Sequence, residues 1–118
     1  MKFKDDIPIY LQIQNEIEKE ILQGNFKPNE KIPSIRQMAK QYRLNPQTVS
    51  NALTFLLENN ILYKRRGRGI YVTKNGAEEL KKMKAAKFRK SELINCIKKA
   101  KLLGLKQKEL INIINQIY

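Results

Sequence analysis

Histidine is absent from the 118 residues of this chain, and cysteine occurs once, at Cys96. Without histidine the chain lacks the commonest metal ligand and the commonest general base. One copy therefore cannot build a Cys/His zinc site or close an internal disulfide. No apolar run approaches the roughly 18 residues that suggest a membrane helix, and residues 1–6 hold no apolar signal stretch. These absences predict a cytoplasmic protein with no metal and no cofactor.

Acidic residues are also scarce, since 24 Lys and Arg face only 11 Asp and Glu, for a net charge of +13. Residues 1–73 carry 12 basic and 7 acidic groups, and residues 74–118 carry 12 and 4, so the net charges are +5 and +8. This excess favours a polyanionic partner, because neutralising phosphates releases condensed counterions. An acidic membrane surface and a simply solvated basic surface are the alternatives.

Three helices are predicted in the first 60 residues. Residues 8–23 form an amphipathic helix, because isoleucine recurs at every fourth position. A second, short helix is expected to start at Ser34 and to end near Tyr42, and Ser34 with Gln37 fits the capping-box pattern. Residues 31–33 between these helices read as a short extended piece.

The third helix is predicted to run to about Asn59, with Asn45 as its N-cap and Pro46 as its first residue. At about 100° per residue its apolar and polar faces separate. The apolar face holds Val49, Ala52, Leu53 and Leu56, and the polar face holds Gln47, Ser50, Asn51 and Thr54. Such a polar face suits hydrogen bonds to base edges and phosphates, although an ordinary surface helix has the same pattern.

Two β-prone runs, residues 61–65 and 70–72, flank a glycine-containing turn and predict a hairpin. Four cations crowd it: Lys64, Arg65, Arg66 and Arg68. They repel one another, so folding alone gives no reason for them, whereas a phosphate backbone or a narrow minor groove does. The alternative is an edge hairpin that charge protects against aggregation.

The order of these elements predicts a mainly α fold with a small β-hairpin, a winged helix-turn-helix in residues 1–73 whose third helix enters the major groove. Ser34 is first of all a helix cap. With Arg36 nearby, the start of the second helix is also a candidate phosphate site. Lys31 and Lys64 are further candidates for phosphate contacts.

Residues 74–118 are lysine-rich and free of proline, and we expect two C-terminal helices, over residues 76–103 and 106–117, broken at Gly104. Two helices cannot bury both of their aliphatic stripes against each other, so a second copy of the chain is the expected cover. Packing back onto the winged domain is the alternative. We expect Cys96 to be a small buried hydrophobe. The expected dimerisation residues are Leu93, Ile97, Leu110, Ile111, Ile114 and Ile117.

Several short motifs occur in register along residues 8–72: Pro8-Ile9-Tyr10, Ile21-Leu22-Gln23-Gly24, Lys31-Ile32-Pro33-Ser34-Ile35-Arg36, Leu44-Asn45-Pro46-Gln47-Thr48-Val49, Asn59-Asn60-Ile61-Leu62 and Arg66-Gly67-Arg68-Gly69-Ile70-Tyr71-Val72. Together they resemble the N-terminal domain of the GntR family of bacterial transcription regulators. The short helical tail resembles that of the YtrA subfamily, which implies a dimer.

The resemblance implies roles for individual residues. Arg36 matches an arginine at the start of the second helix that contacts DNA, and Arg66 with Gly67 matches a wing tip that enters the minor groove. Recognition-helix contacts are implied for Asn45, Gln47, Thr48 and Ser50. Many relatives carry arginine at the position of Pro46 or Ser50, so the base preference of the family does not carry over.

We therefore expect a sequence-specific DNA-binding regulator, a homodimeric repressor that binds an inverted-repeat operator. Its partners are double-stranded DNA and a second copy, with no membrane partner and an unknown effector. The alternative is a winged-helix interaction module that acts through its tail. An enzyme is not expected, because there is no histidine and no nucleophile motif, and residues 66–69 lack the Walker pattern.

Overall fold

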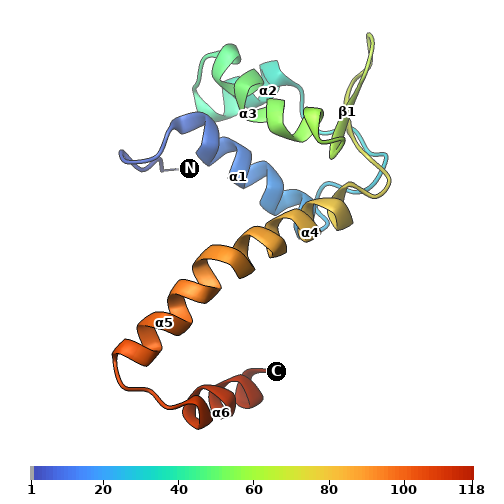
Figure 1. The fold of residues 1–118 in the computed structure, drawn as a ribbon. Helices are drawn as coiled ribbons and strands as arrows, with labels where there is room; N and C mark the ends of the chain where they lie inside the picture. The colour runs from blue at the N-terminus through green and yellow to red at the C-terminus, as the bar shows by residue number, and fades with distance from the viewer. Residues whose placement is uncertain (1) are drawn as a thin grey trace. The chain divides into compact units, whose positions relative to one another are not determined.

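The computed structural model describes residues 2–118 (Figure 1). They form two compact units, residues 2–81 and residues 82–118. We call these the winged unit and the tail unit. The division falls later than residue 73, where the sequence suggested a domain boundary, because Gly76 and Leu80 are buried with the first unit.

The three predicted helices of the winged unit are present as α1 (Ile9–Leu22), α2 (Ile35–Tyr42) and α3 (Pro46–Glu58). Each buries one stripe of apolar side chains, as the spacing predicts. The fully buried residues of these helices are Ile13, Ile17 and Ile21 of α1 and Val49, Ala52, Leu53 and Leu56 of α3, joined by Met38 and Ala39 of α2. The apolar back of α3 is thereby fixed in the core, and its polar front is left outside.

The turn between α2 and α3 depends on one left-handed residue. Arg43 has φ 56°, and the Leu44 N–H donates to the Ala39 carbonyl at 2.9 Å, which closes the end of α2. Asn45 then opens α3, with its Oδ1 accepting from the Gln47 N–H at 2.8 Å. The tight turn and the N-cap expected from the sequence are both confirmed.

The predicted hairpin consists of β1 (Leu62–Arg65) and β2 (Gly69–Val72), antiparallel, with Leu62 opposite Val72 and Arg65 opposite Gly69. It projects beyond the three helices (Figure 1). The expected extended piece before α2 pairs with the free edge of β2, where the Ile32 N–H donates to the Ile70 carbonyl at 2.9 Å. This pairing fixes the wing relative to the start of α2.

Gly76 begins α4 (Gly76–Phe88) where two backbone segments approach closely. A Cβ at this position would lie 2.6 Å from the carbonyl oxygen of Ile61, so only glycine fits without a shift. The Thr73 N–H donates to the same carbonyl at 3.0 Å. The start of α4 is therefore locked to the residue that precedes the hairpin, and Leu80 of α4 is fully buried.

The tail unit continues from α4 through a π-helical turn, η1 (Arg89–Leu93), into α5 (Ile94–Leu102), and ends with α6 (Gln107–Ile117). The expectation of one regular helix over residues 76–103 is therefore wrong in its middle. Ser91 Oγ donates to the Lys87 carbonyl at 2.9 Å, and such a bond competes with the regular helical ladder. The predicted break is confirmed, since Gly104 has φ 85°.

None of the residues of η1, α5 and α6 is buried. The prediction of a buried Cys96 is wrong for the single chain, because this thiol lies exposed on α5. Two short helices enclose too little volume to cover their own side chains. Within residues 2–118, no helix is both long and apolar enough to span a membrane.

Candidate nucleic-acid interface

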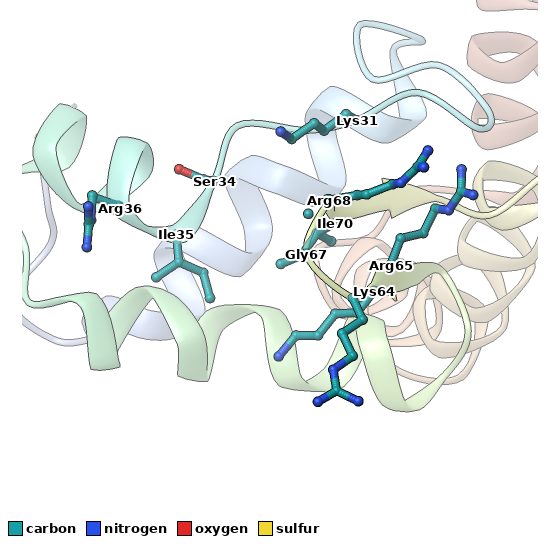
Figure 2. Close-up of a pocket in the computed structure, with 11 residues that line it drawn as sticks. Lys31, Ser34, Ile35, Arg36, Lys64, Arg65, Gly67, Arg68 and Ile70 are labelled. Carbon is teal, nitrogen blue, oxygen red and sulfur yellow. The ribbon is translucent and has the colours of Figure 1, made fainter.

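An open groove of about 470 Å³ lies between the start of α2 and the wing (Figure 2). Its α2 side is formed by Lys31, Ser34, Ile35 and Arg36, and its wing side by residues 64–70. Figure 2 shows that these side chains come from the segment around the start of α2 and from the hairpin. The two segments are about 30 positions apart in the sequence. The fold therefore brings together all four wing cations, Arg36 and Lys31 along one groove, which is an arrangement that attracts a polyanion.

Ser34 acts as the expected cap. Its Oγ accepts from the Gln37 N–H at 3.0 Å, and the Gln37 side chain accepts from the Ser34 N–H at 2.8 Å. The capping box is thus confirmed in both halves. Arg36, two residues further, is exposed, so its guanidinium is available beside the N-terminal end of α2, where the helix dipole also favours an anion.

Glycine at two positions allows the tight backbone of the wing turn and the close approach of Lys31 to it. Gly67 has φ 72°, and the Arg68 N–H donates to the Arg65 carbonyl at 2.8 Å, which closes the turn. Gly69 has φ 126°, and a Cβ there would lie 2.7 Å from Lys31 Cε. Lys31 therefore lies against Gly69, beside the wing turn, and this contact links the α2 side of the groove to the hairpin.

The four wing cations are exposed but not equivalent. The Arg65 guanidinium lies 5.7 Å from the centre of the Tyr71 ring, and Tyr71 stacks on Tyr63 with 5.6 Å between ring centres. A cation over an aromatic face is attracted to it. Arg65 is thus held against the sheet. Sequence reasoning missed this pair of rings, although Tyr63 and Tyr71 could have been paired from the hairpin register.

The polar face of α3 is partly organised by its own hydrogen bonds. Gln47 Nε2 donates to Asn51 Oδ1 at 3.0 Å, and both side chains are exposed. Asn45 Oδ1 is occupied by capping, which leaves its Nδ2 as the free donor. Thr48 and Ser50 are half-buried, so they reach less far than the two amides. The face offers hydrogen-bonding groups and no charge.

The residues expected to form a dimer all belong to the tail unit and are not buried. Exposed fractions are 37% for Leu93, 47% for Ile97, 53% for Ile114 and 77% for Ile117. Ile111 is exposed by 45%, and only Leu110 is half-buried. These side chains form an apolar surface that the chain itself leaves open to solvent.

One ionisable group of the winged unit has a shifted pKa. Burial raises the pKa of the Tyr42 phenol above its usual 10.0, and the carboxylates of Glu16 and Glu20 raise it further. These groups line a hollow of about 280 Å³ between α1 and α2, which does not involve the wing.

Three helices, a tight turn before α3 and a basic wing define a winged helix-turn-helix DNA-binding domain. Residues 9–72 match the family model described as bacterial regulatory proteins, gntR family. That match covers more than half of the chain. The chain therefore belongs to the GntR family of DNA-binding transcriptional regulators, whose members are regulators rather than enzymes.

Two of the curated relatives from Bacillus subtilis illustrate the likeness. The uncharacterized regulator YhcF is 32% identical over 93% of this chain and 89% of its own length. The transcriptional repressor YtrA is 38% identical over 65% of this chain, a match that spans 59% of YtrA. The chain is similar to both, and its likeness to YtrA lies within part of each protein.

Solved structures give the same picture. A GntR family regulator from Listeria monocytogenes has a TM-score of 0.80 at 30% identity, covering 98% of this chain and all of that one. The DNA-binding domain of AraR, solved in complex with operator ORR3, has a TM-score of 0.56 at 30% identity, covering 62% of this chain and 86% of its own. The first likeness extends over the tail, and the second concerns the winged part.

Proposed function

We propose that the chain is a homodimeric repressor that recognises an inverted-repeat operator, with one winged unit on each half-site. The observation that carries the proposal is the basic groove. It combines Arg36 and Lys31 with the wing cations, next to a helix whose exposed face is polar and uncharged. Charges that bind any phosphate backbone are thereby combined with amides suited to reading bases.

Sequence reading is assigned to α3. Gln47 and Asn51 are the two exposed amides on its outer face, and an amide side chain can bond an adenine edge with donor and acceptor together. Thr48 and Ser50 are half-buried and fit shorter contacts to phosphate or to a thymine methyl. The free Nδ2 of Asn45, at the N-terminus of the helix, fits a phosphate oxygen.

Position along the duplex is assigned to the wing and to the start of α2. Arg66 and Arg68, with Gly67 at the turn, fit a narrow minor groove, where the negative potential is strongest. Lys64, Ser34 and Arg36 fit the adjoining backbone. Arg65 has a mixed role, since its guanidinium already lies on Tyr71.

Dimerisation is assigned to the tail unit. The tail unit leaves a set of aliphatic side chains open to solvent, and an apolar surface of this kind marks an interaction site. Its residues are Leu93, Ile97, Leu110, Ile111, Ile114 and Ile117. A second copy presents the same surface, so a two-fold arrangement buries both. Repression rather than activation is supported by the relative YtrA, which is named a repressor. The AraR domain supports operator binding, because it was solved on an operator.

The test is a titration of the protein against duplexes from the promoter of its own operon and against scrambled duplex, by fluorescence anisotropy near physiological salt. The proposal expects one inverted repeat to bind at least 100-fold tighter than scrambled duplex, with two subunits per duplex, which corresponds to about 3 kcal/mol. Equal binding to both would overturn it.

A pair of variants tests whether α3 recognises the bases of the operator. Gln47→Ala is expected to reduce the preference for the operator by about 5-fold to 150-fold, the range for one bidentate base contact. Lys19→Ala on α1, an exposed residue outside the groove, is the control and keeps the full preference. If alanine at Arg36, Arg65, Arg66 and Arg68 together left regulation in cells unchanged, the tail would carry the function as a protein-interaction module instead.

A further inference from the structure

The larger share of this protein's net positive charge lies in the tail unit, outside the winged unit. The tail unit, residues 82–118, has ten basic and two acidic residues, a net charge of +8, whereas the much longer residues 1–81 have a net charge of +5. We infer that the lysine-rich surface of the tail is a second, sequence-independent DNA-contact surface, which adds phosphate contacts to those of the winged unit. This inference rests on the proposed function.

The cations of the tail are on the surface. Lys87 of α4, Lys90 of η1, and Lys98 and Lys99 of α5 are all exposed. Only two carboxylates belong to this unit, Glu92 and Glu109. Glu109 already accepts a hydrogen bond from the Lys106 N–H at 3.1 Å. The unit therefore cannot neutralise its own charge, whatever rotamers its side chains adopt.

Self-association gives no reason for this charge. A dimer formed by the aliphatic stripes would bring two surfaces of +8 together, and like charges oppose that association. A net charge of about 2 to 8 is enough to keep a small domain soluble, and the tail unit reaches the upper end of that range with only 37 residues. The excess is explained if a polyanion lies against the tail when the protein is at work, because bound phosphates remove the repulsion.

DNA is the polyanion that the proposed function already gives this protein as a partner. The winged unit is covalently joined to the tail through α4, so a duplex bound by the winged unit and the lysines of the tail belong to one complex. A lysine-rich surface is also attracted to an anionic membrane by charge alone, so vesicle binding is measured beside DNA binding. Deeper attachment would require the aliphatic stripes, which are not available for lipid in a dimer that buries them.

The measurement is the salt dependence of binding to the operator and to scrambled duplex of equal length. In the test variant Lys87, Lys90, Lys99 and Lys108 are changed to Gln, which keeps helix propensity similar. The matched control carries the same change at Lys2, Lys4, Lys19 and Lys27 of the winged unit, which are exposed and outside the groove. Both variants lose four charges, so a difference between them is local and not due to net charge.

Each lost phosphate contact reduces the slope of log K against log salt concentration by about 0.9. We expect the test variant to lose about 2 or more from that slope, with equal loss of affinity for both duplexes, while the control keeps the parent slope. A third variant with Lys→Arg at the four tail positions is expected to retain the parent slope. Its retention shows that loss in the Gln variant follows charge and not a damaged fold.

A Gln variant with the parent slope, or with the slope of the control, would overturn the inference. Binding of the parent to vesicles of phosphatidylserine and phosphatidylcholine, lost in the Gln variant while its DNA slope is unchanged, would overturn it in favour of a membrane. Failure of the proposed function is separate: it appears as a parent protein that does not prefer the operator over scrambled duplex.

Discussion

The winged unit and the tail unit both carry aliphatic stripes on their helices, and they differ in whether those stripes are buried. In the winged unit the aliphatic stripes of α1 and α3 meet, so that Ile13, Val49 and Leu53 are fully buried. In the tail unit aliphatic residues at the same helical spacing stay exposed, and Ile117 reaches 77%. The pattern in the sequence is alike in both. What differs is whether a third element completes a core, and residues 82–118 of the described structure contain none that does.

The largest effect expected from this difference concerns separated units. Residues 1–81 contain every buried apolar side chain of the described structure, so we expect this fragment to unfold cooperatively by circular dichroism. Residues 82–118 as a peptide are expected to have little helix at low micromolar concentration, because short helices without tertiary packing are marginal. Helix content of the peptide should rise with concentration. A peptide whose helicity is high and independent of concentration would remove the distinction.

The second largest effect is expected from a charge introduced into the exposed aliphatic stripe of α6. Ile114→Lys is expected to weaken the dimer by about 3–6 kcal/mol, because each copy loses the burial of one isoleucine, worth about 1.5–3 kcal/mol. Analytical ultracentrifugation should show monomer, with the thermal unfolding of the winged unit unchanged. Asn112→Lys, which adds the same charge on the other side of α6, is the control and should stay dimeric. A dimer that survives Ile114→Lys would show that this stripe is not the interface.

The corresponding experiment in the winged unit removes a buried side chain from its core. Leu53 is fully buried on the back of α3, so Leu53→Ala is expected to lower the free energy of unfolding by about 2–5 kcal/mol in urea denaturation. Thr54→Ala on the exposed face is the matched control and should change stability by less than about 0.5 kcal/mol. Self-association of the tail should be the same in both. A Leu53→Ala protein as stable as the parent would mean that the core is not packed as described.

Helix caps offer a smaller contrast between the units. Ser34→Ala removes a complete capping box, and we expect a loss of about 0.5–2 kcal/mol in urea denaturation of the winged unit. At the start of α6 only one half of such a box can form, since Glu109 accepts from the Lys106 N–H but a lysine ammonium has no acceptor. Glu109→Ala should therefore cost less than Ser34→Ala. The reverse order would contradict this account of the two helix starts.

The smallest expected effect is a dependence on pH confined to the winged unit. The pKa of Tyr42 is raised above 10.0 by burial and by Glu16 and Glu20, so above pH 10 the unfolded chain loses this proton before the folded one. Stability from this group is therefore complete below pH 10 and declines as the pH rises further. In Tyr42→Phe this part of the decline should be absent, as measured by urea denaturation at pH 9 and pH 11. An identical decline in parent and variant would refute the assignment.

Much of the winged unit could be predicted from local signals. Ser34 with Gln37, and Asn45 with Pro46, mark helix starts through chemistry that acts over three residues, and both are found in the structure. The hairpin followed from two β-prone runs around glycine. The contact of Arg65 with Tyr71, the packing of Lys31 under Gly69 and the approach of Gly76 to Ile61 could not be read in this way, because each joins residues that the sequence separates.

The tail unit shows more clearly what local sequence patterns cannot predict. Its helices and the break at Gly104 are local features and were predicted, whereas the π-helical turn depends on a balance between backbone bonds and the Ser91 hydroxyl that periodicity does not resolve. Cys96 was expected to be buried because it follows Leu93 on an aliphatic helix. It is exposed, since burial requires a neighbouring surface and not only a stripe.

The sequence by itself determined the kind of elements, their order, the excess of positive charge and the family motifs, because helix periods, caps and turns are properties of neighbouring residues. Only the tertiary structure decided which cations share a groove and which aliphatic stripes become core. Wing and α2 meet because the segment before α2 pairs with β2, and this pairing is a long-range hydrogen-bonded contact that no local pattern encodes.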